Sequence, residues 1–324
     1  MADRQPLNAT FFAFRKRERG GVLLGASFAY ALMALVLGGL FVWLNWQAVA
    51  DYMAWTISIS QAGGGEVDPN DPFASMMPPQ SVMALGAWYF LFLIFFYLLL
   101  AAYEAACLRW MIRGESKGFL GLALDGDTWR VYFTYWIWFF LLMAVYFVAV
   151  LTFVGAIVGA AVGSDGNPDA MGAMGPAFLV GIAILLLVIY FGVRFAPAAA
   201  TSVARRRFAF FEAWSVTKGR FWALLGAFVL LWLMYFVGIM ILSGISAFAM
   251  GAAMIGQVQA GMEPSTAEGA FAMFASPSVW VPLALTYAVM IAGAFVFYVA
   301  LFGVNARAVQ AAIEEGKIVP AESA

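Results

Sequence analysis

The sequence contains no histidine, a single cysteine and few charged residues, and each shortage excludes a class of chemistry. Without histidine the chain lacks the commonest general base, proton shuttle and metal ligand. Cys107 alone can form neither an internal disulfide nor a thiolate metal cluster, so we expect it to be a small buried hydrophobe. The sequence also lacks the GxSxG and P-loop motifs. We therefore expect a non-enzymatic protein with no cofactor and no metal site.

Apolar residues dominate what is present. They make up 65% of the 324 residues, whereas charged residues make up 11%. A soluble domain is typically about 45–50% apolar and about 25% charged, so lipid is the expected solvent. The long apolar runs predict an all-α polytopic membrane protein, a single transmembrane domain over residues 1–324. Its six spans are expected at residues 22–46, 81–108, 131–163, 177–204, 221–255 and 279–309.

The basic residues are sorted by the predicted topology. All 17 Lys and Arg residues fall before span one, around the loop after span two, at the end of span four and in the loop after it, or near the end of span six. The three opposite loops carry only acidic side chains, which are Asp51, Glu66, Asp68, Asp71, Asp165, Asp169, Glu263 and Glu268. Because basic loops stay in the cytoplasm, both termini are expected there, with tails at residues 1–7 and 313–324. A positive inner surface is expected to attract anionic lipid headgroups.

A repeated unit is indicated by similar segments before alternate spans. FFAFRKRERGGVLLGA precedes span one and FFEAWSVTKGRFWALLGA precedes span five, while FLGLALDGDTWRVYF takes this place before span three. We expect three hairpin repeats, roughly residues 8–108, 115–204 and 205–312, with short interfacial amphipathic helices. Two such helices are expected on the acidic side, one over residues 47–60 with Trp55 as an anchor and one after Ser265.

Four polar side chains lie towards the basic ends of the returning spans: Glu104, Arg194, Asn305 and Arg307. Ionisable groups within a span usually have partners, so we expect Glu104 to pair with Arg194. The four could line a polar vestibule that opens inward, or could extend to nearby headgroups. In addition, Pro197 is expected to bend span four. By contrast, Asp125 and Asp127 are expected to be solvated turn residues.

Glycines at every fourth position mark the acidic-side end of span three. Gly155, Gly159 and Gly163 form a GxxxGxxxG pattern that lets another helix approach closely. The partner could be a helix of the same chain or of a second subunit, and a homo-oligomer stays open.

The segment RRRFAFFEAWSVTKGRFW at residues 205–222 is the most distinctive of the chain. As a helix it would place three aromatic side chains, Phe208, Phe211 and Trp214, on one side. Its flanking cations are Arg205, Arg206, Arg207, Lys218 and Arg220. This composition is typical of a helix that lies among headgroups, either as a structural anchor or as a binding site for an anionic lipid or a membrane-protein partner.

The same region resembles bacterial membrane proteins of the YciC-like type and the membrane domain attached to some glycerophosphodiester phosphodiesterases. The resemblance covers RFAPAAATSVARRRFAFFEAWSVTKGRFWALLGAF, in which Arg194 and Pro197 end a span and Trp214, Thr217 and Gly219 lead into the next. It implies a six-span fold in the bacterial inner membrane. The phosphodiesterase members carry catalysis on a separate soluble domain that has no counterpart in these residues, so the resemblance implies no such activity.

The function expected from the sequence is therefore that of an inner-membrane protein that organises lipid or a partner membrane protein through an aromatic-basic cytoplasmic surface. A nucleic-acid partner is not expected. The alternative is a transporter or pore for a small or lipid-like solute. Such a protein usually has polar residues at the bilayer midplane, and the middles of these spans are almost wholly apolar.

Overall fold

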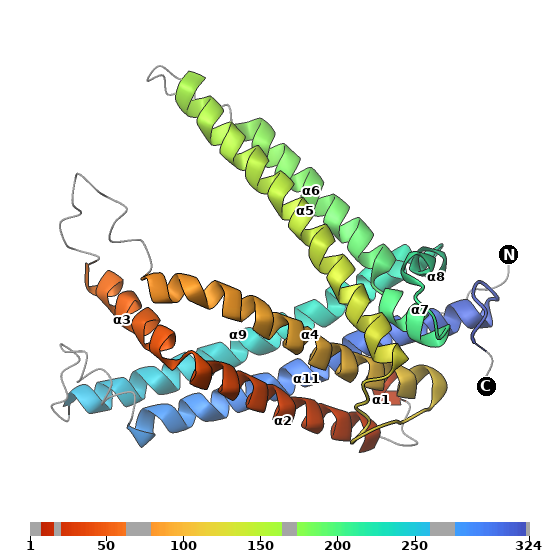
Figure 1. The fold of residues 1–324 in the computed structure, drawn as a ribbon, viewed down its shortest axis with the longest axis horizontal. Coiled ribbons are helices and arrows are strands. Elements are labelled where there is room, and N and C mark those ends of the chain that lie inside the picture. Colours follow the sequence, from red (N-terminus) through yellow and green to blue (C-terminus); the bar gives the residue numbers. More distant parts are fainter. Residues whose placement is uncertain (1–7, 16–20, 63–78, 164–173, 260–275, 322–324) are drawn as a thin grey trace. The chain divides into compact units, whose positions relative to one another are not determined.

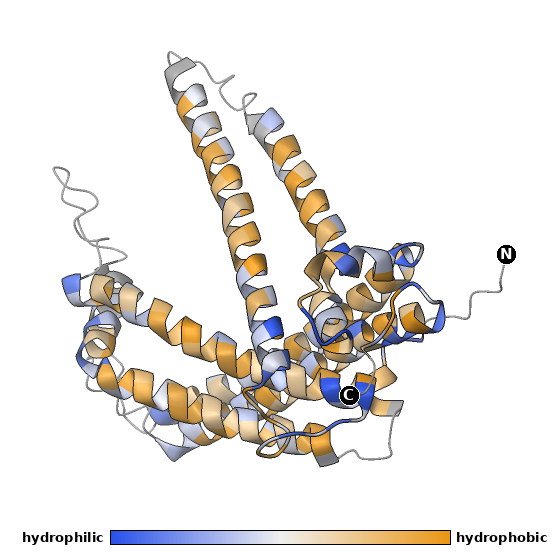
Figure 2. Ribbon diagram, turned by 45° about the vertical axis from the view of Figure 1, so that its right-hand side comes forward, coloured by the Kyte–Doolittle hydropathy of each residue, from blue (hydrophilic) through white to orange (hydrophobic). Residues whose placement is uncertain are grey.

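The structure of the protein is a computed structural model that describes residues 8–15, 21–62, 79–163, 174–259 and 276–321. Six of the helices are long and apolar enough to cross a membrane. They are α2 (Gly21–Leu44), α4 (Gln80–Arg113), α5 (Gly126–Gly163), α6 (Met174–Phe195), α9 (Phe221–Gln259) and α11 (Pro277–Glu314). Figure 2 shows hydrophobic residues along these helices and hydrophilic ones gathered at their ends. The protein is thus an all-α multi-pass membrane protein, as predicted.

Short helices join the long ones. They are α1 (Phe12–Arg15), α3 (Trp46–Ala62), α7 (Ala198–Ala204), the 3-10 turn η3 (Phe210–Glu212) and α8 (Ala213–Thr217). Helix α3 confirms the helix expected over residues 47–60, and it starts after Asn45, whose side-chain amide donates to the Phe41 carbonyl oxygen at 2.9 Å. The helix expected after Ser265 lies outside the described residues.

Span four is not one continuous helix over residues 177–204, and the bend expected at Pro197 is a full break. Helix α6 ends at Phe195, and α7 begins at Ala198. Proline has no backbone N–H and its ring clashes with the preceding turn, so it kinks or breaks a helix, and here it breaks span four. The chain then restarts, with the Thr201 amide donating to the Pro197 carbonyl oxygen at 2.8 Å. This break turns α7 into a separate buried segment.

The chain divides into two compact units, and these do not follow the three expected repeats. Unit 1 comprises residues 1–26, 100–230 and 299–324, and unit 2 comprises residues 27–99 and 231–298. Every Lys and Arg of the described residues belongs to unit 1, whereas the ranges of unit 2 contain neither residue type. The threefold repeat itself stays a prediction.

Unit 1 contains the antiparallel pair α5 and α6, which run side by side in Figure 1, together with α7, η3 and α8. It also contains the ends of α4 and α11, where the Gln310 amide donates to the Met111 carbonyl oxygen at 2.8 Å. Helix α1 packs on α11 so closely that a Cβ built at Gly303 would lie 2.9 Å from the Ala13 Cβ. Only glycine fits this contact without a shift of the backbone.

Unit 2 is held by aromatic side chains on the remaining parts of α2, α4, α9 and α11. The ring centroids of Phe41 and Phe92 lie 4.9 Å apart, and those of Tyr235 and Phe297 lie 4.5 Å apart. A T-shaped contact of 5.7 Å joins Tyr30 to Phe295. Such ring pairs pack helices against one another without polar groups, as a lipid-embedded bundle requires.

Candidate functional site

The segment of residues 205–222 is the most basic and aromatic part of unit 1, and we call it the aromatic-basic collar. It is not the single helix predicted from its sequence. The chain turns after Arg205, passes through Arg206 with φ of 49°, forms η3 and α8, and turns again at Gly219 with φ of 79° before α9. The Ser202 hydroxyl accepts a 3.0 Å bond from the Ala209 amide and so holds the first turn.

The aromatic side chains of the collar separate into buried and exposed ones despite the broken helix. Phe210 is buried against α7 and α8, and its ring stacks on Phe195 with centroids 5.1 Å apart. Phe208, Phe211 and Trp214 are exposed, Phe211 by 75%. The three side chains expected on one side of a helix are thus all exposed, but tight turns rather than one helical face present them.

The cations of the collar form ion pairs with few carboxylates. The guanidinium groups of Arg205 and Arg207 both contact Glu212, the latter at 2.5 Å. Arg206 pairs with Glu115 at 2.7 Å. Lys218 is exposed, and no ion pair involving it occurs among the described residues. The collar therefore keeps a surplus of positive charge, carried mainly by the side chains of Arg207 and Lys218.

Arg220 ties the collar to the end of α11. Its guanidinium bonds Glu315, and the Lys317 ammonium approaches the same carboxylate to 2.7 Å. These two cations lower the pKa of Glu315 to about 2, Arg220 having the larger effect. The pKa of Glu115 is also lowered, because Arg113, Arg206 and Lys117 together outweigh the opposing effect of burial. Both carboxylates thus remain charged at any physiological pH.

Arg194 lies under the collar in an aromatic cage. Its guanidinium carbon lies 4.9 Å from the Trp214 ring centroid, 5.3 Å from that of Tyr190 and 5.4 Å from that of Phe221. It donates to the Thr217 carbonyl oxygen at 3.1 Å, and the Thr217 hydroxyl donates to the Arg194 carbonyl oxygen at 3.3 Å. Arg194 therefore fastens α6 to α8 through cation–π and hydrogen-bond contacts.

The predicted ion pair between Glu104 and Arg194 is wrong, as no ion pair joins the two in the described structure. Glu104 is buried and accepts a hydrogen bond from the Tyr135 hydroxyl of α5 instead. A neutral hydroxyl partner on the neighbouring helix satisfies a buried carboxyl group without the desolvation of a second charge. Glu104 consequently ties α4 to α5, and Arg194 has no part in that contact.

The other two members of the predicted polar cluster are also separate. Asn305 is buried, and its Oδ1 atom accepts no hydrogen bond from any described residue. Arg307 pairs with Glu314 of the same helix at 2.7 Å. No hydrogen bond or ion pair among the described residues joins any two of Glu104, Arg194, Asn305 and Arg307. The four side chains therefore do not form one polar cluster in the described structure, and each lies in its own surroundings near a helix end.

The sequence analysis missed a buried charge network at the start of α5. Asp127 is buried and contacts the guanidinium groups of Arg113 and Arg130. Asp125 accepts from the fully buried Arg109 at 2.6 Å, and it caps α5 by accepting from the amides of residues 127 and 128. The expectation of two solvated turn residues is therefore wrong. The sequence did contain a sign of the cap, because Asp125 directly precedes the first residue of a long apolar helix, a position that Asp favours.

Two of the three glycines expected to let another helix approach closely meet no other helix in the described part of the chain. No heavy atom of the described residues lies within 4 Å of a Cβ built at Gly155 or Gly159, the backbone of their own helix apart. Gly163 ends α5, and the residues that follow it lie outside the described ranges. Contact of this glycine face with a second subunit stays a prediction.

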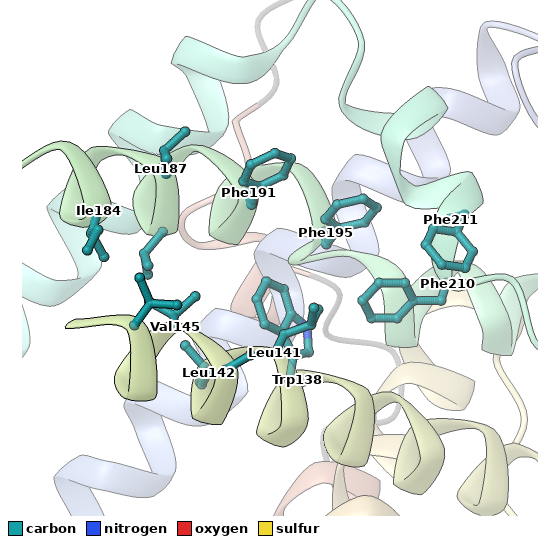
Figure 3. A pocket seen from close by; sticks show the side chains of 13 residues that line it. Trp138, Leu141, Leu142, Val145, Ile184, Leu187, Phe191, Phe195, Phe210 and Phe211 are labelled. Atoms are coloured by element: carbon teal, nitrogen blue, oxygen red, sulfur yellow. The ribbon is translucent and has the colours of Figure 1, made fainter. Parts of the chain in front are cut away.

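An apolar groove runs between α5 and α6 and ends at the collar (Figure 3). Its volume is about 510 Å³, and side chains from both helices and from η3 line it. Those drawn and labelled include Trp138, Leu142 and Val145 of α5, Ile184, Leu187, Phe191 and Phe195 of α6, and Phe210 and Phe211. Its volume is typical of ligand pockets, which measure about 300–1,000 Å³.

The described residues offer an apolar groove and a basic, aromatic surface, both suited to binding. They contain no group of three or more His, Cys, Asp or Glu side chains that could hold a metal ion. Cys107 is buried, as predicted. Comparison of the chain with protein-family models, with characterised proteins and with solved structures gives no match. The groove, the collar and their charges are therefore the basis on which a function is proposed.

Proposed function

We propose that this protein is a non-enzymatic protein of the bacterial inner membrane that organises anionic lipid, or a partner membrane protein, through the aromatic-basic collar. The observation that carries this proposal is the joint exposure of aromatic rings and cations where the apolar helices end. Phe211 and Trp222 are 75% and 78% exposed, and Arg207 and Lys218 lie in the same segment. Amphipathic rings and cations of this kind favour the headgroup layer of a membrane.

The charge of the collar favours anionic over neutral lipid. Residues 205–220 contain five basic side chains and one acidic one, Glu212. A basic residue near a membrane surface attracts anionic lipid by about 1 kcal/mol at physiological ionic strength. Because Arg205 and Arg207 share Glu212 while Lys218 is unpaired among the described residues, we expect Arg207 and Lys218 to contribute most.

The orientation and the family belong to the same proposal. The sorting of basic residues supports cytoplasmic termini and a collar that faces the cytoplasmic leaflet. The resemblance to YciC-like membrane proteins over residues 194–228 supports the inner membrane as the location. A tag fused after Ala324 should therefore be accessible only from the cytoplasmic side of intact cells.

The lipid preference can be measured with spin-labelled lipids. The full chain is reconstituted in phosphatidylcholine vesicles, and the association of spin-labelled phosphatidylglycerol is compared with that of spin-labelled phosphatidylcholine. Removing one collar charge with Lys218→Gln should weaken the phosphatidylglycerol preference by up to roughly fivefold, the equivalent of about 1 kcal/mol. Adding Arg207→Gln should weaken it further.

Lys218→Arg is the matched control, because it retains the charge and should retain the preference. High salt should reduce the preference of the unaltered protein, since exposed charges are screened. Equal association of the two lipids with the unaltered protein would show that the collar does not select anionic lipid.

The transporter alternative finds no observation in its favour. It requires an inward vestibule lined by Glu104, Arg194 and Asn305. Glu104 and Asn305 are buried, Arg194 is enclosed by aromatic rings, and the lining of the groove is apolar. A lipid-binding protein accounts for the same features more simply.

A further inference from the structure

We infer that the groove between α5 and α6 binds one acyl chain of an anionic phospholipid whose headgroup lies at the collar. The inference rests on the proposed function and deepens it, because it assigns the site of the apolar part of the ligand. It is carried by the dimensions of the groove, by its two closed ends and by the charge at one of them.

The length of the groove matches one leaflet. Its lining runs from Trp138 to Val148 on α5 and from Ile184 to Phe195 on α6. At a rise of about 1.5 Å per residue these stretches are about 15 Å and about 16 Å long. The hydrocarbon core of a bilayer is about 30 Å thick, so one leaflet accounts for about 15 Å. An acyl chain that enters from the side, with its headgroup at the collar, would reach the midplane where the lining ends.

Both ends of the groove are closed. At the collar end, Phe210 is packed between Phe195 and Trp138, with a centroid distance of 6.1 Å to the latter. Towards the other end the helices approach closely, because a Cβ built at Gly181 would lie 3.4 Å from the Phe153 ring. A helix of a partner protein has a diameter of about 10–12 Å and spans the whole core, so this short closed groove fits a single chain better.

The side of the groove is open to the surrounding lipid. Leu141, Leu142, Leu187 and Phe191 line it and remain exposed in the chain. Figure 3 shows Leu141 and Leu142 on α5 and Leu187 and Phe191 on α6, all of which line the groove. An acyl chain in this space would bury apolar surface on both helices that the protein alone leaves open.

The collar end carries the charge that a phosphate group would contact. Glu212 directly follows Phe211, which lines the groove, and two guanidinium groups share this one carboxylate. The local net charge is therefore positive, and the side chain of Arg207 is 58% exposed. A phospholipid with its chain in the groove and its phosphate beside Arg207 satisfies both the apolar lining and the excess cation.

Photo-crosslinking tests the inference. The full chain is reconstituted in vesicles of equal parts phosphatidylcholine and phosphatidylglycerol, with a trace of phosphatidylglycerol that carries a diazirine on one acyl chain. Peptides covering residues 138–148 and 184–195 should capture the probe more than the rest of α5 and α6. Ala144→Trp, which fills the groove, should reduce their labelling to the level of the other lipid-facing segments.

Ala183→Trp is the matched control, since Ala183 is exposed on α6 but does not line the groove. It should leave the labelling pattern unchanged. Unaltered burial of the Cys107 thiol shows that a variant is folded. Should Ala144→Trp fail to fold, Val148→Trp blocks the groove nearer the midplane and is expected to lower the same labelling.

Three results would overturn the inference. They are uniform labelling along α5 and α6, labelling that both Val148→Trp and Ala144→Trp leave unchanged, and capture of another polypeptide in place of lipid by a photoreactive residue at position 144. The experiment is repeated with phosphatidylcholine that carries the same diazirine. Equal labelling by this neutral probe and by the phosphatidylglycerol probe would refute the anionic headgroup and with it the lipid selection by the collar. A groove pattern that persists in that case would still place an acyl chain between the helices, so the two failures are distinguishable.

Discussion

Removal of the Asp125 carboxylate should destabilise the protein far more than removal of an exposed carboxylate. The Arg109 guanidinium that Asp125 neutralises is fully buried, and the two groups are 2.6 Å apart. Breaking a buried ion pair by removing one partner costs about 3–5 kcal/mol, because the other charge stays buried without compensation. The Asp125 side chain is 29% exposed, so water can reach the site and the lower value of about 3 kcal/mol is expected.

Asp125 also caps α5, and the two roles can be separated. Loss of an Asp cap costs typically about 1 kcal/mol, whereas Asn caps a helix about as well as Asp. Asp125→Ala should therefore lower the free energy of unfolding by about 4 kcal/mol, the sum of both effects. Asp125→Asn should lower it by about 3 kcal/mol, because only the charge is lost.

Cys107 supplies the assay. It is the only cysteine of the chain, and it is fully buried on α4, two residues before Arg109. A thiol-reactive dye labels it only when this region opens, so the extent of labelling during an SDS titration reports unfolding. Glu314→Ala is the control, because Glu314 belongs to an exposed pair worth about 0–1 kcal/mol. Equal losses in Asp125→Ala and Glu314→Ala would falsify the assignment of a buried, stabilising charge network.

Two further predictions follow from particular contacts. Gly303→Leu should destabilise the packing of α1 on α11, because even a Cβ at this position would lie 2.9 Å from that of Ala13. Gly293→Leu on the same helix should have little effect, since no described atom outside the backbone of that helix lies within 4 Å of a Cβ there. The SDS concentrations at the unfolding midpoints of the two variants give the comparison. Acidification should loosen the end of α11, because the pKa of Glu315 is depressed to about 2 in the folded protein. The ion pairs of Glu315 therefore contribute fully to stability above its unfolded-state pKa of about 4.3, and this contribution declines as the pH falls towards 2. A cysteine introduced at Ile318, which is buried, should become more accessible over that interval to a pyridyl disulfide, a reagent that reacts with thiols in acid. Glu315→Gln should abolish this pH dependence.

The sequence was sufficient to predict the six spans and the helix after span one. Apolar runs of more than 20 residues must be helical in lipid, because a helix satisfies every backbone polar group within the segment. This reasoning needs only local information, and the structure confirms it to within a few residues for five of the six spans. The exception is span four, in which a bend at Pro197 was predicted but the complete break was not.

The sequence was not sufficient to predict which polar groups would meet. Glu104 and Arg194 were paired because their charges are opposite and both lie near the basic ends of their spans. The partner of Glu104 is instead Tyr135, a residue that carries no charge signal. Asp125 and Asp127, at the start of α5, were misassigned for the opposite reason. A turn sequence suggests solvent, whereas here the two carboxylates pair with three arginines.

What the sequence alone determined is the membrane-spanning architecture, because it follows from the cost of placing polar groups in hydrocarbon and from the sorting of charge along one dimension. Only the tertiary structure decided that α5 and α6 leave an apolar groove, that Phe210 packs at its collar end, and that two arginines share Glu212 beside it. The physical reason is that burial and pairing depend on which helix faces come together. A periodic pattern of apolar residues without a polar stripe leaves those faces undetermined.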